Sequence, residues 1–231
     1  MIERILPAVV SAVDTDLDAA DAVLLGTEEA DIARAVDRRR REFSTARHCA
    51  RRALAELGLP AVAIPRGPKG EPCWPEGVVG SITHCTGYRG AVVARTRDLH
   101  TVGIDAEPNG PLPDGVLGAV SLPAERTMLA DLAGTDAGGV DRVHWDRLLF
   151  CAKESVYKAW FPLARRWLGF EDARVALDPE GGTFRVDLLV PGPTVAGRPL
   201  TRFAGRWMVA EGILLAAVAL PTDAALPTDP N

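Results

Sequence analysis

Positive charge is not in excess in this chain. Its 26 lysines and arginines are outnumbered by 31 aspartates and glutamates, which gives a formal net charge of −5. An acidic balance argues against a general nucleic-acid binder or membrane-surface binder, although a local basic patch is compatible with it. We therefore expect no nucleic acid among the partners.

Long hydrophobic runs and a cysteine framework are absent as well. The run ILLAAVAL, residues 213–220, is far too short to span a bilayer. The opening stretch MIERILPAVVSAVDTDLD reaches acidic residues too early for a secretory signal. The four cysteines follow no regular spacing and include no C-x₂₋₄-C pair, which argues against a disulfide frame and a zinc site. The sequence predicts a cytoplasmic protein with reduced thiols and no membrane contact.

The first half of the chain reads as a helical segment followed by strands. With 231 residues, 47% of them hydrophobic, the chain can form one large domain or two small halves. Residues 27–58 are typical of helix, with Thr27 as N-cap and Gly58 at the end, and leave open whether one helix or two form. The runs VVGSITHC, GAVVART and TVGIDAE then predict three strands.

The second half repeats this order. A loose segment at 132–140 precedes HWDRLLFCAKESVYKAWF, which predicts a helix. The runs ARVAL, TFRVDLLV, GRWMV and GILLAAVAL predict strands, with Glu211–Gly212 as a hairpin turn. Helix and then antiparallel strands, twice over, predict an α+β fold of two similar halves. We place the N-terminal half at 1–108, the C-terminal half at 109–220 and a flexible tail at 221–231.

The stretch VGIDAEP carries two carboxylates at the end of a predicted strand. Asp105 and Glu107 are two residues apart, so in an extended chain they share one face, roughly 7 Å apart. A pair of strand-end acids facing water would be the ordinary explanation. If the two acids are buried, however, their repulsion makes them costly without a cation between or beside them.

The helix FCAKESVYKAW carries charges among apolar residues. Glu154 and Lys158 are neighbours at i,i+4 spacing, as are Lys153 and Tyr157. A solvated face would suit an arbitrary helix, but this one is apolar on most sides, which is typical of a buried helix whose charges need partners. Together with the two strand acids, Glu154 could complete a three-carboxylate site, and carboxylate oxygens suit Mg²⁺ with a phosphate as a further ligand.

These motifs resemble one enzyme family. GIDAE followed by FCAKESVYKAW, with GSITHC upstream, is similar to the 4'-phosphopantetheinyl transferases, above all to the single-chain, pseudo-dimeric type of actinobacteria and enterobactin synthesis. The resemblance runs from about residue 38 to residue 170 and includes TARHCAR, KGEPCWP, GYRGAVV, SLPAER and FPLARRWLGFED. It implies two α+β halves related by a pseudo-two-fold, each a helix packed on a small, mainly antiparallel sheet.

The resemblance also implies a reaction. Members transfer the 4'-phosphopantetheine arm of coenzyme A to a serine of an apo acyl or peptidyl carrier protein and release 3',5'-ADP. Asp105, Glu107 and Glu154 would hold Mg²⁺, for which Mn²⁺ can substitute, on the coenzyme A pyrophosphate. Glu154, or a metal-bound water that it orients, would take the serine proton, and Lys158 would stabilise the leaving group.

A further set of residues is matched to coenzyme A by the same resemblance. Arginine forks suit phosphates, and the cluster RRRREF offers several, with the choice between Arg39 and Arg40 left open. His84 falls where the family places a histidine against a phosphate, although an ordinary turn histidine explains it equally well. The full set expected to contact coenzyme A is Arg39, Arg47, Arg66, Lys69, Gly70, His84, Lys153 and Tyr157.

Two other functions use the same residues. A Mg²⁺-dependent pyrophosphohydrolase would need a water nucleophile in place of serine, but the glutamate-rich helix of such hydrolases is missing. A non-catalytic coenzyme A or carrier-protein binding module would have no evident use for Glu154 and Lys158. We therefore expect a monomeric transferase, which serves fatty-acid, polyketide or nonribosomal peptide carriers without the sequence choosing among them.

Overall fold

The computed structural model describes residues 1–135 and 142–222, and strand β1 precedes the helices of the first half, whereas in the second half the helices α3 to α5 precede strands β5 to β10. The helices and 3₁₀ turns are η1 (Ile2–Ile5), α1 (Glu28–Asp31), α2 (Asp37–Glu56), α3 (Val116–Val120), α4 (Pro123–Thr135), α5 (Trp145–Ala164) and η2 (Phe170–Asp172). The strands are β1 (Ser11–Thr15), β2 (Val78–Cys85), β3 (Tyr88–Arg95), β4 (Leu99–Pro108), β5 (Ala173–Asp178), β6 (Thr183–Leu188), β7 (Thr194–Val195), β8 (Arg198–Pro199), β9 (Arg202–Ala210) and β10 (Ile213–Pro221). Among the described helices, none has the length and apolar character needed to cross a membrane.

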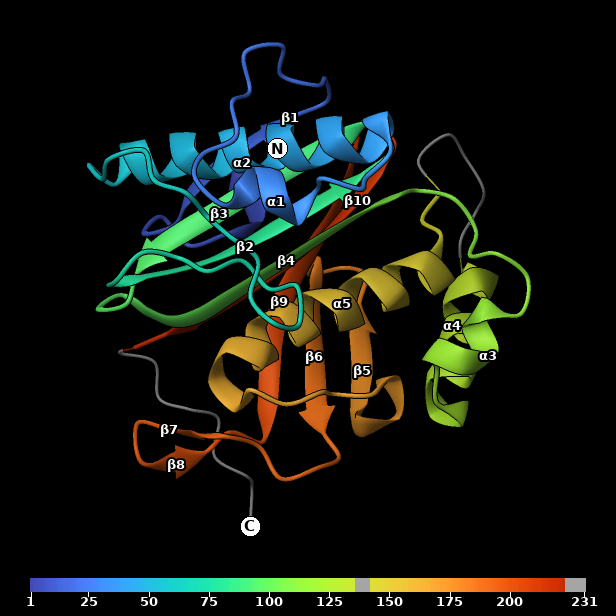
Figure 1. Cartoon of the computed structure of the whole chain (residues 1–231). Helices are drawn as coiled ribbons and strands as arrows, with labels where there is room; N and C mark the ends of the chain where they lie inside the picture. The colour runs from blue at the N-terminus through green and yellow to red at the C-terminus, as the bar shows by residue number, and fades with distance from the viewer. Residues whose placement is uncertain (136–141, 223–231) are drawn as a thin grey trace.

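The N-terminal sheet has the strand order β1-β3-β2, with antiparallel neighbours, and α2 lies across it at the top of Figure 1. Ala50 and Leu54 of α2 are fully buried against Ala91 and Val93 of β3. Residues 27–58, for which the sequence left open one helix or two, form two helices: α1 ends at Asp31, and α2 begins at residue 37. The edge strand β1 and the turn η1 were not predicted.

The C-terminal sheet has the order β4-β10-β9-β6-β5, and α5 packs on it (Figure 1). The predicted hairpin turn is confirmed, because Glu211 and Gly212 both have positive φ, 51° and 75°, as a type I′ turn requires. The helices α3 and α4 were not predicted. The prediction of a loose segment at 132–140 is wrong for residues 132–135, because they continue α4. Residues 136–140 lie outside the described residues, as does the tail from 223.

Strand β4 connects the two halves. It hydrogen-bonds to β10, so that Asp105 lies opposite Ala216 in the C-terminal sheet, although it precedes the expected boundary at 108. Its other side faces β2 of the N-terminal sheet, where the main-chain N–H groups of Ile104 and Ala106 donate to side-chain hydroxyls of β2. The α+β class with antiparallel sheets is therefore confirmed, with a seam of hydroxyl groups between the sheets.

Gly103 explains how close β4 lies to α5. A Cβ atom at this position would sit 2.1 Å from the main-chain oxygen of Ser155, far inside van der Waals contact. Only glycine allows the strand and the helix to approach this closely. The close approach brings the carboxylate of Asp105 to the side chains of α5.

Candidate active site

Asp105 is the most enclosed of the predicted metal-binding acids. Its residue is 5% exposed, and its Oδ1 atom receives hydrogen bonds from Lys158 Nζ (2.7 Å) and from Thr83 Oγ1 (3.1 Å). Its Oδ2 atom is buried and has no hydrogen-bond partner. An unpaired carboxylate oxygen inside a protein is costly, so this oxygen is open to a cation or to a donor brought by a ligand.

Glu107 lies two residues further along β4 and is partly exposed. Arg147 in the first turns of α5 donates from Nη1 to Glu107 Oε2 at 3.0 Å. Burial, and then the charge of Asp105, raise the pKa of Glu107, while Arg147 opposes the shift. Sequence reasoning missed Arg147. The signal for it was its spacing, because it lies two helical turns before Glu154 and so shares its face.

Glu154 and Lys158 lie one turn apart on the face of α5 that meets β4. Burial, followed by the charge of Asp105, raises the pKa of Glu154. Burial disfavours the charged form of Lys158, but the charge and hydrogen bond of Asp105 raise its pKa above the usual value. Mutual influence of this kind places the acids near one another. In residues 1–135 and 142–222, however, no three acidic, histidine or cysteine side chains converge into a ready-made metal site.

The donor set nevertheless fits a hard divalent cation. Lys158 and Arg147 already neutralise one oxygen each of Asp105 and Glu107, and Asp105 Oδ2 is left without a partner. The available ligands are carboxylate oxygens, which Mg²⁺ prefers. The burial and repulsion that raise the pKa of Glu154 are the conditions that a bound cation would relieve.

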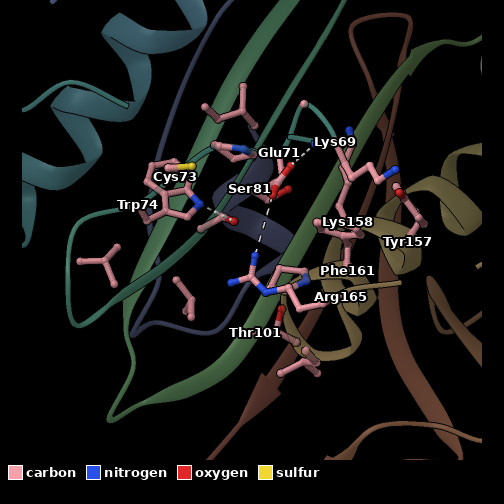
Figure 2. Close-up of a pocket in the computed structure, with 18 of the residues that line it drawn as sticks. Lys69, Glu71, Cys73, Trp74, Ser81, Thr101, Tyr157, Lys158, Phe161 and Arg165 are labelled. Carbon is pink, nitrogen blue, oxygen red and sulfur yellow. Dashed lines mark hydrogen bonds and ion pairs between the residues drawn. The ribbon is translucent and has the colours of Figure 1, made fainter. Parts of the chain in front are cut away.

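A cleft of about 560 Å³ opens beside these charges (Figure 2). Its walls come from the loop 69–74, from β2 and from α5. The predicted residues Lys69, Gly70, Glu154, Tyr157 and Lys158 all line it. An ion pair of 3.9 Å between Arg165 and Glu71 joins its two sides, as the sticks of Figure 2 show.

The apolar part of this cleft comes from the loop 69–74, from β2 and from α5, whose Tyr157 packs on Trp167 outside the lining. The ring of Tyr157 lies 4.7 Å from that of Trp167, between their centroids, and 6.0 Å from that of Phe161. Trp167 is 69% exposed, and Trp74 contributes a further ring to the lining. Charged groups at one side and rings at the other suit a ligand with an anionic end and a largely uncharged arm.

The arginine run at the start of α2 points in two directions. Arg39 contacts His84 Nε2 through its guanidinium and lies 3.8 Å from Glu42. Arg40 turns away, toward Glu29 and the main-chain oxygen of Ile32. Of the two candidates that the sequence left open, Arg39 is therefore the one beside His84.

His84 carries no charge at neutral pH. Burial, and then the positive charge of Arg39, lower the pKa of His84 to about 4, against the opposing charge of Glu42. Its Nδ1 atom lies 3.7 Å from Glu42. An anion arriving between Arg39 and His84 would find a fixed guanidinium and a neutral imidazole.

Arg66 flanks a second hollow, of about 550 Å³, together with Lys69 and Gly70. Its main-chain N–H donates to Asp31 Oδ2 at 2.9 Å. Three of the residues predicted to bind coenzyme A therefore lie together at one end of the cleft.

Arg47 and Lys153 are placed elsewhere. Arg47 is 5% exposed, stacks on Phe43 and donates from Nε to the oxygen of Ile64 at 2.8 Å; burial lowers its pKa to about 10. Lys153 is also buried, with Nζ 2.8 Å from Glu125 Oε2. Burial lowers the pKa of Lys153, and Glu125 opposes the shift. Neither side chain lines the cleft, and Arg39, His84 and Arg66 do not line it either. Of the predicted coenzyme A residues, the cleft brings together Lys69, Gly70 and Tyr157.

A buried acid cluster with a lysine, beside a cleft with a basic end, is suited to phosphoryl-type group transfer. Comparison with known proteins names the group. Residues 27–94 match the 4'-phosphopantetheinyl transferase N-terminal domain, and residues 101–195 match the 4'-phosphopantetheinyl transferase superfamily. The chain belongs to the 4'-phosphopantetheinyl transferase family.

Individual relatives agree with this assignment. The chain is 53% identical to 4'-phosphopantetheinyl transferase Svp of Streptomyces mobaraensis, over 97% of this chain and 91% of the relative. It is 55% identical to PptT of Mycobacterium tuberculosis, over 82% of each chain. It is 52% identical to Npt of Nocardia iowensis, over 95% of this chain and 99% of the relative. The expected enzyme class is confirmed: the protein transfers the phosphopantetheine arm of coenzyme A to a carrier-protein serine.

Proposed function

We propose that this cleft binds coenzyme A and that Asp105, Glu107 and Glu154 hold the divalent cation, Mg²⁺ or Mn²⁺, at its pyrophosphate. The observation that carries the proposal is the buried Oδ2 atom of Asp105, which lacks a partner beside two acids whose pKa values are raised. A bound divalent cation would neutralise pyrophosphate charge and make the phosphorus easier to attack.

Lys158 and Glu154 divide the remaining chemistry. The serine oxygen of the carrier attacks the phosphorus that bears the pantetheine arm, and the bond from that phosphorus to the bridging oxygen breaks. Lys158, kept charged by Asp105, donates to the oxygen that leaves with 3',5'-ADP. Glu154 receives the serine proton, because it lines the cleft one helical turn from Lys158.

Coenzyme A is oriented by charge at one end and by rings at the other. Arg39 and His84, with Arg66, Lys69 and Gly70, receive the nucleotide phosphates and the adenine end. Tyr157 and the neighbouring rings line the pantetheine arm. The basic residues gather on one side, which lets an acidic chain bind a polyanion.

The two halves are related by a pseudo-two-fold, and a buried glutamate in the first half supports this. Glu28 is fully buried, and its Oε2 atom accepts a hydrogen bond from the N–H of Leu25, three residues earlier. Its Oε1 atom accepts from the N–H of Ile64, in the loop after α2. The cation that neutralises it is Arg51 of α2, 2.9 Å away.

Glu125 occupies the same role in the second half. It is 1% exposed, and its Oε2 atom accepts from the N–H of Leu122, again three residues earlier. Its Oε1 atom accepts from the N–H of Val175, which follows α5. Lys153 of α5 is its cation. The same proposal places the two halves at 1–108 and 109–220. It also includes a cytoplasmic location and a monomeric state.

The test is transfer itself. Apo carriers of the fatty-acid, polyketide and nonribosomal peptide types are incubated with the chain, coenzyme A and Mg²⁺, and followed by mass spectrometry for the mass of the added arm. We expect at least one carrier to be modified, and no modification by D105A or after chelation with EDTA. Full activity in excess EDTA would overturn the metal proposal.

A further inference from the structure

We propose that Thr83 is a positioning residue that fixes the orientation of the Asp105 carboxylate and thereby the place of the oxygen that is open to the cation. The inference rests on the proposed role of Asp105 as a metal ligand. Thr83 lies in β2, in the N-terminal sheet, and is 3% exposed. It thus reaches the acid from the opposite half of the molecule.

The hydroxyl of Thr83 makes two bonds at once. It accepts a hydrogen bond from the N–H of Ala106 at 3.1 Å and lies 3.1 Å from Asp105 Oδ1. A hydroxyl has one hydrogen and two lone pairs. Because the Ala106 N–H occupies a lone pair and a carboxylate only accepts, the single hydroxyl hydrogen is directed at Asp105. The direction of this bond is therefore fixed by the main chain of β4.

Two donors on the same oxygen lock the carboxylate. Thr83 and Lys158 both donate to Oδ1 of Asp105, which leaves Oδ2 buried and unpaired. Lys158 alone could bind either oxygen, since a carboxylate can turn about its Cβ–Cγ bond. With the hydroxyl of Thr83 present, one oxygen position must meet both donors, so the plane of the carboxylate and the position of its second oxygen are fixed. Outer groups that orient a metal ligand in this way typically contribute 10- to 100-fold to metal affinity.

Ser81 provides a comparison inside the same strand. It lies two residues before Thr83, is also 3% exposed, and accepts the N–H of Ile104 at 3.1 Å. In the described part of the chain its hydroxyl is not hydrogen-bonded to either acid of β4. Loss of the Ser81 hydroxyl thus removes a seam bond without touching the carboxylate.

The experiment measures Mn²⁺ affinity by EPR titration in the absence of coenzyme A, because Ser81 also lines the cleft proposed to bind it. The variants are T83V, which keeps the shape of threonine, T83S, which keeps the hydroxyl, S81A and D105N. We expect T83V to bind Mn²⁺ about 10- to 100-fold more weakly, T83S and S81A to keep the affinity of the unchanged chain, and D105N to lose the most. Circular dichroism melts verify folding, and T83C replaces T83V if the valine chain does not fold.

Kinetics provide a second readout. The transfer rate of T83V should return at high metal concentration, while the KM for coenzyme A at saturating metal stays unchanged, as expected for a residue that acts through a metal ligand. Equal loss of Mn²⁺ affinity in T83V and S81A would overturn the inference, because the seam rather than Asp105 would then be responsible. If T83V keeps the Mn²⁺ affinity of the unchanged chain while D105N loses affinity, the inference is overturned as well, although Asp105 remains a ligand. Unchanged D105N would overturn the proposed metal role itself.

Discussion

In the N-terminal half, Arg51 of α2 holds the buried Glu28, whereas in the C-terminal half Lys153 of α5 holds the buried Glu125. Both glutamates also accept two main-chain N–H groups, so the frame is the same and only the cation differs. A buried ion pair with its remaining lone pairs satisfied keeps its partners in one geometry. Such pairs hold each long helix in place relative to the helix that precedes it, α1 before α2 and α4 before α5.

The two halves differ in the charged side chains that α2 and α5 present outside these buried ion pairs. The start of α2 presents arginines, among them Arg39, toward His84. The middle of α5 presents Glu154 and Lys158 toward the acids of β4. In the proposed function, the start of α2 therefore offers positive charge for a polyanion, and the middle of α5 joins the acids of β4 for chemistry. The comparison teaches that two similar buried ion pairs support helices with different proposed tasks.

The largest expected effect concerns chemistry in the C-terminal half. E154Q keeps the size and one ligating oxygen of Glu154 but loses its basic site. We expect kcat to fall by about 10²- to 10⁴-fold even at saturating Mg²⁺, with coenzyme A still bound. Steady-state transfer to an apo carrier over a range of metal concentrations measures this. Near-normal kcat at saturating metal would show that Glu154 only holds the ion.

The next effect concerns the two buried ion pairs between a glutamate and a cation. K153M and R51M each leave a buried glutamate without its cation, which typically costs about 3–5 kcal/mol in the free energy of unfolding. Chemical denaturation measures it, and K153R and R51K serve as charge-keeping controls. We expect similar losses in both halves. Folded K153M that binds coenzyme A much more weakly, without loss of stability, would instead support the original expectation of a coenzyme A contact.

A smaller effect concerns binding in the N-terminal half. R39A should weaken the binding of coenzyme A by about 1–3 kcal/mol, because a charged hydrogen bond to phosphate is lost. R40A is the matched control, since Arg40 contacts Glu29 instead of His84. Calorimetry with coenzyme A and with 3'-dephospho-coenzyme A compares the two variants. Equal losses of coenzyme A affinity in R39A and R40A would contradict the proposal that Arg39, and not Arg40, contacts coenzyme A.

The smallest effect is a pH dependence of stability. Burial and the charge of Arg39 lower the pKa of His84 from its ordinary value of 6.5 to about 4, so between these values the unfolded chain binds a proton that the folded chain does not. Stability should therefore be complete above about pH 6.5 and fall as the pH drops toward 4. H84Q should have a shallower decline over this window in thermal melts. An identical decline in both chains would count against a buried neutral His84.

Much of this arrangement could be read from the sequence, and the misses have physical causes. Strand and helix periodicity located the acids of β4 and the helix of Glu154, because both segments are strongly apolar. Periodicity cannot tell Lys153 from its neighbour Glu154, since adjacent residues point about 100° apart and only packing decides which faces the cleft. Arg39 and Arg40 are the same case.

The pairing of strands was also beyond reach. Asp105 lies opposite Ala216, more than a hundred residues later, and no local pattern encodes a partner at that distance. Arg147 could have been found by its spacing from Glu154. Thr83 could not, because its role depends on a contact between two sheets.

The late partner of β4 also sets an order of assembly. Residues of β4 leave the ribosome long before β10, and Thr101 of β4 further waits for its hydrogen bond to Ala159 of α5. Contacts between such distant segments form slowly, because a long loop must close first. The side chains that contact the acids of β4 come from β2 and α5, but the strand that holds β4 in its sheet is made last. We therefore expect truncation before residue 213 to give a chain without a functional acid cluster.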